Sequence, residues 1–241
     1  MLGILYFMPL LAAVCGQLLR GPQEHWSRAD RSSAGIAPDP SRTPEAVVQV
    51  YAARTYGWRG VFGVHTWVAL KPAEARVWER FEVVGFGVNQ GRPAVRGGPG
   101  IPDGRWYGNI PTLLGELRGE RAEAAIPILR EAVRDYPYPN QYTVWPGPNS
   151  NTFTAHLVRQ VPELRIDLPA NAVGKDYPID GVFARTPSGT GHQISLGGIF
   201  GVSVGVVEGI EVNLFGLNAG LDLRRPALRL PGLGRLGMRS P

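Results

Sequence analysis

Cysteine and lysine are almost missing from this chain. Its 241 residues include one cysteine, Cys15, and lysine occurs only at Lys71 and Lys175, which leaves 23 of the 25 basic residues as arginine. One cysteine excludes an intrachain disulfide and any zinc site built from several cysteines. The four histidines lack the close spacing to acidic residues that metal sites need, and the glycine-rich stretch 97–100 does not follow a strand-to-helix pattern. We therefore expect no metal and no cofactor.

The composition indicates a folded, basic protein. Hydrophobic residues make up 44% of the chain, which excludes a disordered protein, and 32 glycines and 22 prolines argue against a helical bundle. The net charge is +5 with a pI of about 9.6. A nucleic-acid-binding protein would cluster its arginines with aromatic residues, whereas these are scattered. We expect no nucleic-acid partner, and we expect a weak preference for anionic surfaces such as a membrane leaflet. The composition predicts no oligomeric state.

The N-terminal stretch has no charged side chain. Residues 2–19, LGILYFMPLLAAVCGQLL, have about the length that crosses a bilayer and exceed a usual signal-peptide core. The alternatives are an uncleaved anchor, a cleaved signal, a lipoprotein signal ending at Cys15, and a buried core helix. We predict that residues 1–19 are a membrane anchor or signal segment and that the body of the protein is exported or membrane-associated.

Hydrophobic periodicity divides the remainder into three parts. Residues 20–45 are polar and read as a linker. Residues 46–180 predict an α+β domain, a small antiparallel sheet packed with helices. Its expected strands are 60–72 and 81–88, and its expected helices are 111–119, 120–136 and 151–160. Residues 46–55 could form a helix or a strand, and their valines favour the strand. Residues 181–241 predict a glycine-rich β-hairpin, with its turn at Glu208-Gly209, followed by a loose basic tail.

Two residues could form a catalytic pair. His65 lies in the strand 60–72, on the face that also carries Trp67, and Ser150 follows the rigid stretch WPGP at the start of a helix. Unpaired N–H groups at a helix N-terminus can hold an oxyanion, and a histidine is the usual general base for a serine nucleophile. The alternative is that Ser150 or Asn149 only caps the helix and that His65 is structural.

The order of these motifs resembles a known superfamily. The chain has a strand with the histidine motif VHTW, then a strand FEVVGFG, then helices, and then the motif PNSNTF. This order is similar to that of the circularly permuted papain-like superfamily, which includes lecithin retinol acyltransferases and PPPDE deubiquitinase-like peptidases. The resemblance covers roughly residues 46–160 and implies a nucleophile at Ser150, where the superfamily has cysteine, with His65 as base. It also implies a cleft or oxyanion support built from Asn149, Asn151, Trp67 and Trp145. Candidates for the third group are Glu82, Asn89 and Gln90.

A second resemblance extends over nearly the whole chain. The stretches VVQVYAAR, GVHTWVALKP, WPGPNSNTF, GKDYP and PSGTGHQISLGG are similar to an uncharacterised bacterial family, DUF3750. It implies a bacterial envelope setting and no established activity. We therefore carry three hypotheses. The first is an amide or ester hydrolase or acyltransferase that acts on a lipid- or peptide-like envelope molecule. The second is a non-catalytic envelope binding module with a degenerate papain-like cleft, and the third is a structural protein docked through its C-terminal hairpin.

Overall fold

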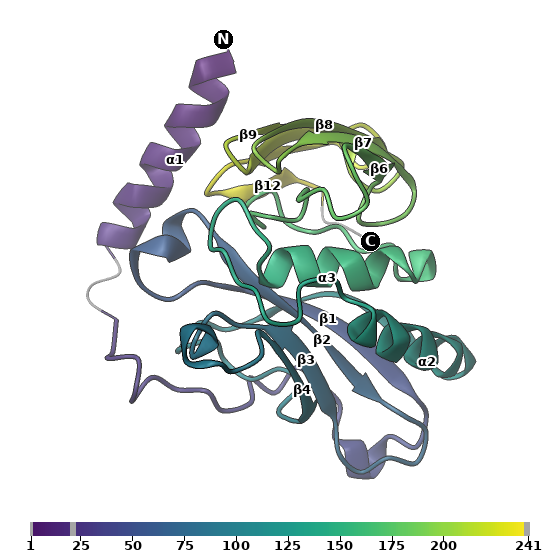
Figure 1. Cartoon of the computed structure of the whole chain (residues 1–241). Helices are drawn as coiled ribbons and strands as arrows, with labels where there is room; N and C mark the ends of the chain where they lie inside the picture. The colour runs from purple at the N-terminus through teal and green to yellow at the C-terminus, as the bar shows by residue number, and fades with distance from the viewer. Residues whose placement is uncertain (1, 20–22, 239–241) are drawn as a thin grey trace.

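A five-stranded antiparallel sheet forms the centre of the molecule (Figure 1). The structure is a computed structural model and describes residues 2–19 and 23–238. The strands lie in the order β4-β3-β2-β1-β5. Their bounds are β1 Val47–Arg54, β2 Val64–Lys71, β3 Glu79–Val83, β4 Val95–Pro99 and β5 Thr112–Arg118. The expected α+β class is confirmed. The strands expected at 46–55 and 60–72 correspond to β1 and β2, whereas the strand expected at 81–88 is β3, which begins earlier and ends at Val83. β4 lies inside the stretch 89–109, which is rich in glycine, proline and arginine.

The two faces of this sheet carry different cores, because side chains alternate along a strand. Val64, Val68 and Leu70 of β2 belong to the larger core, whereas Trp67 and Ala69 belong to a smaller cluster on the other face. This division is the one that the alternation in residues 60–72 predicts. It also fixes the direction of His65, which shares its face with Trp67.

Two helices cover the face with the larger core (Figure 1). They are α2, Glu120–Arg134, and α3, Ser150–Arg159, and both are amphipathic. Pro127 lies within α2 and does not end it. Ala125 and Leu129 of α2 are buried together with Phe153 and Leu157 of α3.

The segment expected to be a linker lies against the opposite face. Asp103 accepts hydrogen bonds from the backbone N–H groups of Ile36 and Ala37 and from the Ser33 hydroxyl. The Trp78 indole donates to the carbonyl of Pro38 at 3.4 Å. The expectation of a linker is therefore wrong for these residues, because their backbone is held by a buried carboxylate and an indole that lie far along the chain.

The helix expected at residues 111–119 is wrong, because these residues form β5 and pair with β1. Leu114 and Leu117 pack in the larger core, whereas Leu113 packs against the smaller cluster on the other face, because the register between β1 and β5 shifts between Val50 and Tyr51. A Cβ at Gly115 would lie 2.6 Å from Cδ1 of Ile166, so glycine allows the chain beyond α3 to approach the sheet closely.

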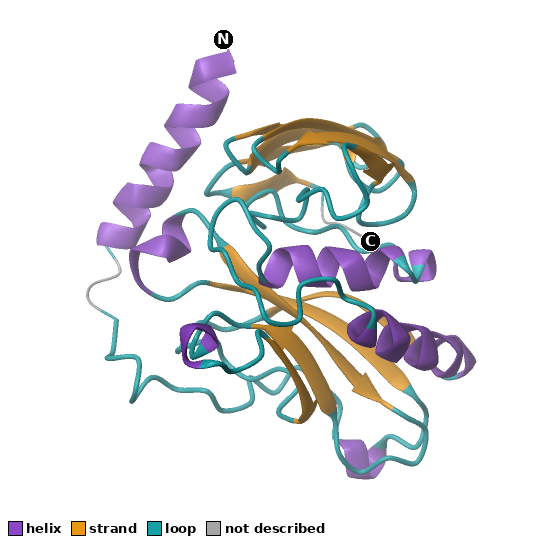
Figure 2. Cartoon of the chain, in the orientation of Figure 1, coloured by secondary structure: helices purple, strands orange, loops and turns teal. Residues whose placement is uncertain are grey.

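The C-terminal region is a seven-stranded antiparallel meander (Figure 2). Its order is β12-β11-β10-β9-β8-β7-β6. The bounds are β6 Phe183–Arg185, β7 Gly191–Leu196, β8 Phe200–Gly205, β9 Gly209–Leu214, β10 Leu217–Asp222, β11 Ala227–Leu230 and β12 Gly234–Gly237. The expected hairpin is the pair β8 and β9. The described part of the expected loose tail instead forms β11 and β12 and extends the sheet.

The N-terminal helix α1, Leu2–Leu18, stands beside the C-terminal sheet (Figure 1). The Tyr6 hydroxyl donates to the carbonyl of Val212 at 2.5 Å, with the carbonyl of Leu217 3.1 Å away. Phe7, Leu11 and Leu18 are exposed. Among the described residues, no helix has the length and apolarity required to cross a membrane.

Two adjacent residues of α2 test this arrangement. Leu129 is fully buried between the helices and the sheet, whereas Ile128 is 43% exposed. We expect Leu129→Ala to lower the free energy of unfolding by about 2 to 5 kcal/mol, because it leaves a cavity in the larger core. The matched change Ile128→Ala should stay within about 0.5 kcal/mol of the unaltered protein. Urea denaturation of both variants measures the difference, and equal losses would contradict the helix orientation.

Candidate functional site

Asn149, and not Ser150, caps helix α3. Its side-chain oxygen accepts from the backbone N–H groups of Asn151 at 2.9 Å and Thr152 at 3.3 Å. The Thr152 hydroxyl in turn accepts from the backbone N–H of Asn149 at 3.1 Å, which completes a capping box. Ser150 is the first residue of the helix and is buried. Of the alternatives for PGPNSNTF, capping by Asn149 is the one that the hydrogen bonds support.

The same motif joins α3 to its neighbours. The Asn151 amide donates to the carbonyls of Val64 at 3.0 Å and Val173 at 2.8 Å, and its oxygen accepts from the Thr66 hydroxyl at 2.9 Å. The Asn149 amide also donates to the carbonyl of Val173, at 3.0 Å. Both asparagines therefore satisfy buried backbone groups of β2 and of the chain after α3, which is a positioning role.

His65 lies in an aromatic and charged site on the other face of the sheet. Its Nε2 is 2.6 Å from Oε2 of Glu82 on β3, and its ring stacks on Trp106 with centroids 3.6 Å apart. Arg80 donates to the same carboxylate oxygen at 2.9 Å, and its guanidinium lies 4.1 Å from the ring centroid of Trp67. Glu82 is thus the partner of His65 among the three candidates for the orienting group.

Burial and hydrogen bonding decide the charges of this site. Burial lowers the pKa of His65 and outweighs the opposite effect of Glu82. Burial alone would raise the pKa of Glu82, but the hydrogen bonds from His65 and Arg80 overcome it and lower that pKa to about 2. We infer that a neutral imidazole donates its Nε2 proton to an ionised carboxylate.

The structure does not bring His65 and Ser150 together. Thr66 points toward α3, where its hydroxyl contacts Asn151, so the adjacent His65 points to the opposite face of the same strand. Because β2 lies between β3 and β1, it is not an edge strand around which the imidazole could reach. Within residues 2–19 and 23–238, the Ser150 hydroxyl has no hydrogen bond to an imidazole. The expected dyad is therefore not formed.

The two tryptophans expected in a cleft with Ser150 lie in different parts of the structure. Trp67 is buried beneath the 101–109 loop, where its indole donates to the carbonyl of Pro102 at 2.6 Å and stacks on Tyr51. Trp145 is half-exposed and donates to the carbonyl of Phe215 at 2.8 Å, in the turn between β9 and β10. Trp67 therefore belongs to the His65 site, whereas Trp145 ties the loop before α3 to the C-terminal sheet.

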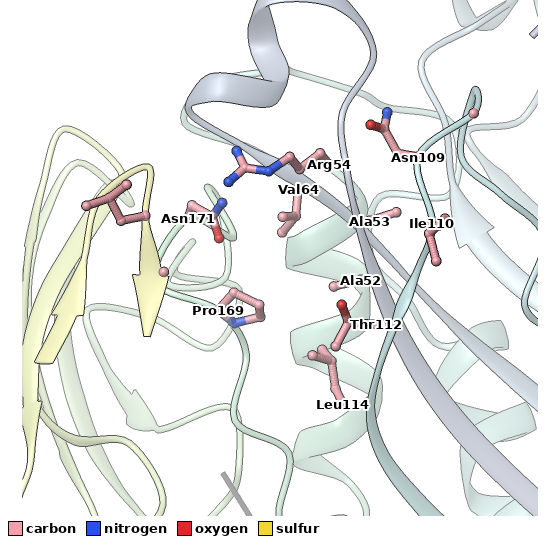
Figure 3. A pocket seen from close by; sticks show the side chains of 13 residues that line it. Ala52, Ala53, Arg54, Val64, Asn109, Ile110, Thr112, Leu114, Pro169 and Asn171 are labelled. Atoms are coloured by element: carbon pink, nitrogen blue, oxygen red, sulfur yellow. The ribbon is translucent and has the colours of Figure 1, made fainter. Parts of the chain in front are cut away.

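A pocket of about 550 Å³ opens where the two sheets approach each other (Figure 3). One side is formed by the end of β1 and by the chain leading into β5, and the other by Pro169, Asn171 and the β11–β12 turn. The lining combines apolar side chains with four polar ones, namely Arg54, Asn109, Thr112 and Asn171. The Arg54 guanidinium donates to the carbonyl of Gly60 at 2.7 Å. The volume falls within the range of small-molecule sites. Sequence periodicity cannot reveal the pocket, because its walls come from five separate segments.

A buried charge cluster joins the chain after α3 to the C-terminal sheet. Lys175 pairs with Glu211 on β9, and Arg229 on β11 pairs with Asp167 and, at 3.0 Å, with Glu211. Burial raises the pKa of Asp167 to about 6 despite the nearby Arg229. The motif GKDYP places Lys175 next to Asp176 in the chain, but the ion-pair partner of Lys175 is Glu211. In the described residues, no group of three or more histidine, cysteine or acidic side chains is arranged to hold a metal ion.

The His65 site makes a prediction about acid stability. The pKa of Glu82 is about 2 in the folded protein against an ordinary value of 4.5, so its carboxylate stabilises the fold above pH 4.5 and this contribution is lost as the pH falls toward 2. We expect Glu82→Gln to lower the free energy of unfolding by about 1 to 3 kcal/mol near neutral pH. The deficit should shrink between pH 4.5 and 2.

Denaturant titrations across that pH range measure this deficit. Glu123→Gln, on the exposed face of α2, is the matched control and should leave the stability unchanged. A deficit of the same size at every pH would mean that Glu82 is not held in its ionised form.

Comparison with known proteins identifies the family of this chain. No curated protein and no solved structure matches it. A family model described as "Protein of unknown function (DUF3750)" matches residues 45–177, from the start of β1 to the loop that carries Lys175 and Asp176. This range covers the central sheet, both of its helices, the His65 site and the PGPNSNTF motif, and it amounts to more than half of the chain. The chain therefore belongs to the DUF3750 family of proteins of unknown function.

Proposed function

We propose that this protein is a non-catalytic binding module of the bacterial envelope that holds a small amphiphilic molecule in the pocket between its two sheets. The single observation that carries the proposal is the pocket of about 550 Å³, whose lining sets apolar side chains beside Arg54, Asn109 and Asn171. Such a lining fits a molecule with a hydrocarbon part and a group that accepts hydrogen bonds, for example a carboxylate or an amide.

The directions of the side chains favour binding over catalysis. A serine nucleophile needs an aligned base, and His65 instead donates to Glu82 on the far face from α3. The permuted papain-like relationship remains a hypothesis. Two features support it, namely the order of the histidine strand before the α3 helix and the position of Glu82 on the neighbouring strand, where a third group would lie. A papain-like fold that has lost its catalytic pair would also account for serine at position 150, where the superfamily has cysteine.

Attachment to a membrane through α1 is part of the proposal. The helix has no charged residue, and the side chains of Phe7, Met8, Leu11 and Leu18 are exposed. Exposed hydrocarbon on an uncharged helix favours the interface of a lipid layer. The envelope location follows from this surface together with the family's expected setting.

Occupation of the pocket can be tested with a defined probe, a fluorinated medium-chain carboxylate observed by fluorine NMR. We expect saturable binding to the unaltered protein and at least tenfold weaker binding to Ile110→Trp, because Ile110 lines the pocket and is exposed, so the larger ring can fill the entrance without disturbing the core. Ile128→Trp, on the exposed face of α2, is the control and should bind normally. Equal binding by both variants would place the probe outside the pocket.

The hydrolase hypothesis makes a different prediction at Ser150. We expect a fluorophosphonate probe to leave Ser150 unlabelled, because no imidazole contacts its hydroxyl in the described structure. Ser150→Ala should fold with a loss of at most about 1 kcal/mol, since Asn149 provides the cap. Labelling is read by mass spectrometry of the intact protein. Covalent labelling that disappears in Ser150→Ala and in His65→Ala would replace the binding proposal by the hydrolase.

A further inference from the structure

The C-terminal sheet has its polar face inside and its apolar face outside. In an ordinary two-faced antiparallel sheet the apolar face packs on the core and the polar face meets water. Here the buried positions face the rest of the molecule and are mostly polar. The polar ones are Gln193, Ser195, Ser203, Glu211, Asn213, Asn218, Asp222 and Arg229, and the apolar ones are Ala227 and Leu230.

The outward positions form continuous apolar rows across the strands. The pairing register places Val204, Ile210, Leu221, Leu228 and Leu236 side by side on five consecutive strands, and all five are exposed. At a strand spacing of about 4.8 Å, this row extends over roughly 19 Å.

A second row lies next to the first on the same face. It consists of Phe183, Ile194, Val202 and Val212. We call the two rows together the outer face. An exposed apolar area of this extent marks an interaction surface.

The charges around the outer face indicate what covers it. The three acidic residues between positions 181 and 238 are Glu208, Glu211 and Asp222, and all of them are buried. The basic residues Arg185, at the β6 edge, and Arg224, in the β10–β11 turn, are exposed. Asp180, directly before β6, is an exposed carboxylate, but it is paired with Arg159 at 3.2 Å. An apolar surface bordered by exposed arginines, on strands that carry no exposed carboxylate, complements a lipid leaflet with anionic headgroups.

We propose that the outer face of the C-terminal sheet docks on an anionic lipid surface and lies in its interfacial layer. This inference deepens the membrane attachment proposed above and adds to α1 a second, independent contact surface. The two surfaces are neighbours, because Tyr6 of α1 is hydrogen-bonded to carbonyls of β9 and β10. Docking by both would hold the body of the protein in one orientation.

Single nitroxide labels can read the two surfaces separately, since Cys15 on exposed α1 is the chain's one cysteine. A label on native Cys15 reports on α1. Two further labels are placed on new cysteines, each in a Cys15→Ser background. The label on Val204→Cys reports on the outer face. The label on Ile128→Cys is the control, because Ile128 is 43% exposed and therefore similar to Val204, which is 54% exposed. The probes are phosphatidylcholine vesicles with and without phosphatidylglycerol, and the readout is electron paramagnetic resonance with dissolved oxygen and a water-soluble nickel complex.

We expect vesicles containing phosphatidylglycerol to raise the accessibility of the label at 204 to oxygen and to lower its accessibility to nickel, with no change at 128. If the accessibility of the label at position 204 to oxygen and nickel does not change, the proposal is overturned. In that case, entry of the label at Cys15 into the lipid would show that attachment through α1 still holds. Spin–spin broadening at 204 without vesicles would show that a second copy of the chain covers the outer face, which also overturns it.

Charge removal gives a second measurement that does not depend on labelling. We expect Arg224→Gln to weaken vesicle binding about fivefold, and only when phosphatidylglycerol is present. Arg121→Gln on α2 removes the same charge from another exposed site and should leave binding unchanged. Equal weakening by both variants would indicate attraction by net charge alone and would overturn docking by the outer face.

Discussion

The pairing of Lys175 with Glu211 and of Arg229 with Asp167 is the interaction on which the rest of the structure depends. Charges buried this deeply are tolerated only when they are paired and hydrogen-bonded. Their presence between the two sheets requires a polar lining on the facing side of the C-terminal sheet. Because side chains alternate along each strand, the apolar residues of these strands then point away from the protein.

Much of the central sheet could be predicted from local pattern. The alternation around His65 correctly separates the faces of β2, and the amphipathic pattern of residues 120–136 correctly predicts α2. The strand at 112–118 cannot be told from a helix by its pattern, because a short run with three leucines and a glutamate fits both periods. The decisive fact is tertiary, since Gly115 accommodates Ile166 at close range.

The residues of the candidate site could be predicted from the sequence, but their positions relative to one another could not. Chain order places a histidine strand before the helix that begins at Ser150, but it does not say which face of the sheet that helix covers. Thr66 decides this, because its contact with Asn151 turns His65 the other way. The partner Glu82 could be named among the candidates from its place on the next strand. The pocket could not be predicted from the sequence, because its walls come together only when both sheets have formed.

The position of Lys175 and Asp176 at the end of the family match has a consequence for what counts as a module in this protein. The match ends at residue 177, yet Lys175 pairs with Glu211, and Asp176 accepts hydrogen bonds from Asn213 at 3.1 Å and Asn218 at 2.8 Å. The unit delimited by sequence similarity is therefore not a unit of folding. Cutting the chain at that boundary would leave the Lys175 ammonium and the Asp176 carboxylate buried without their partners, so the matched segment and the C-terminal sheet form one cooperative body.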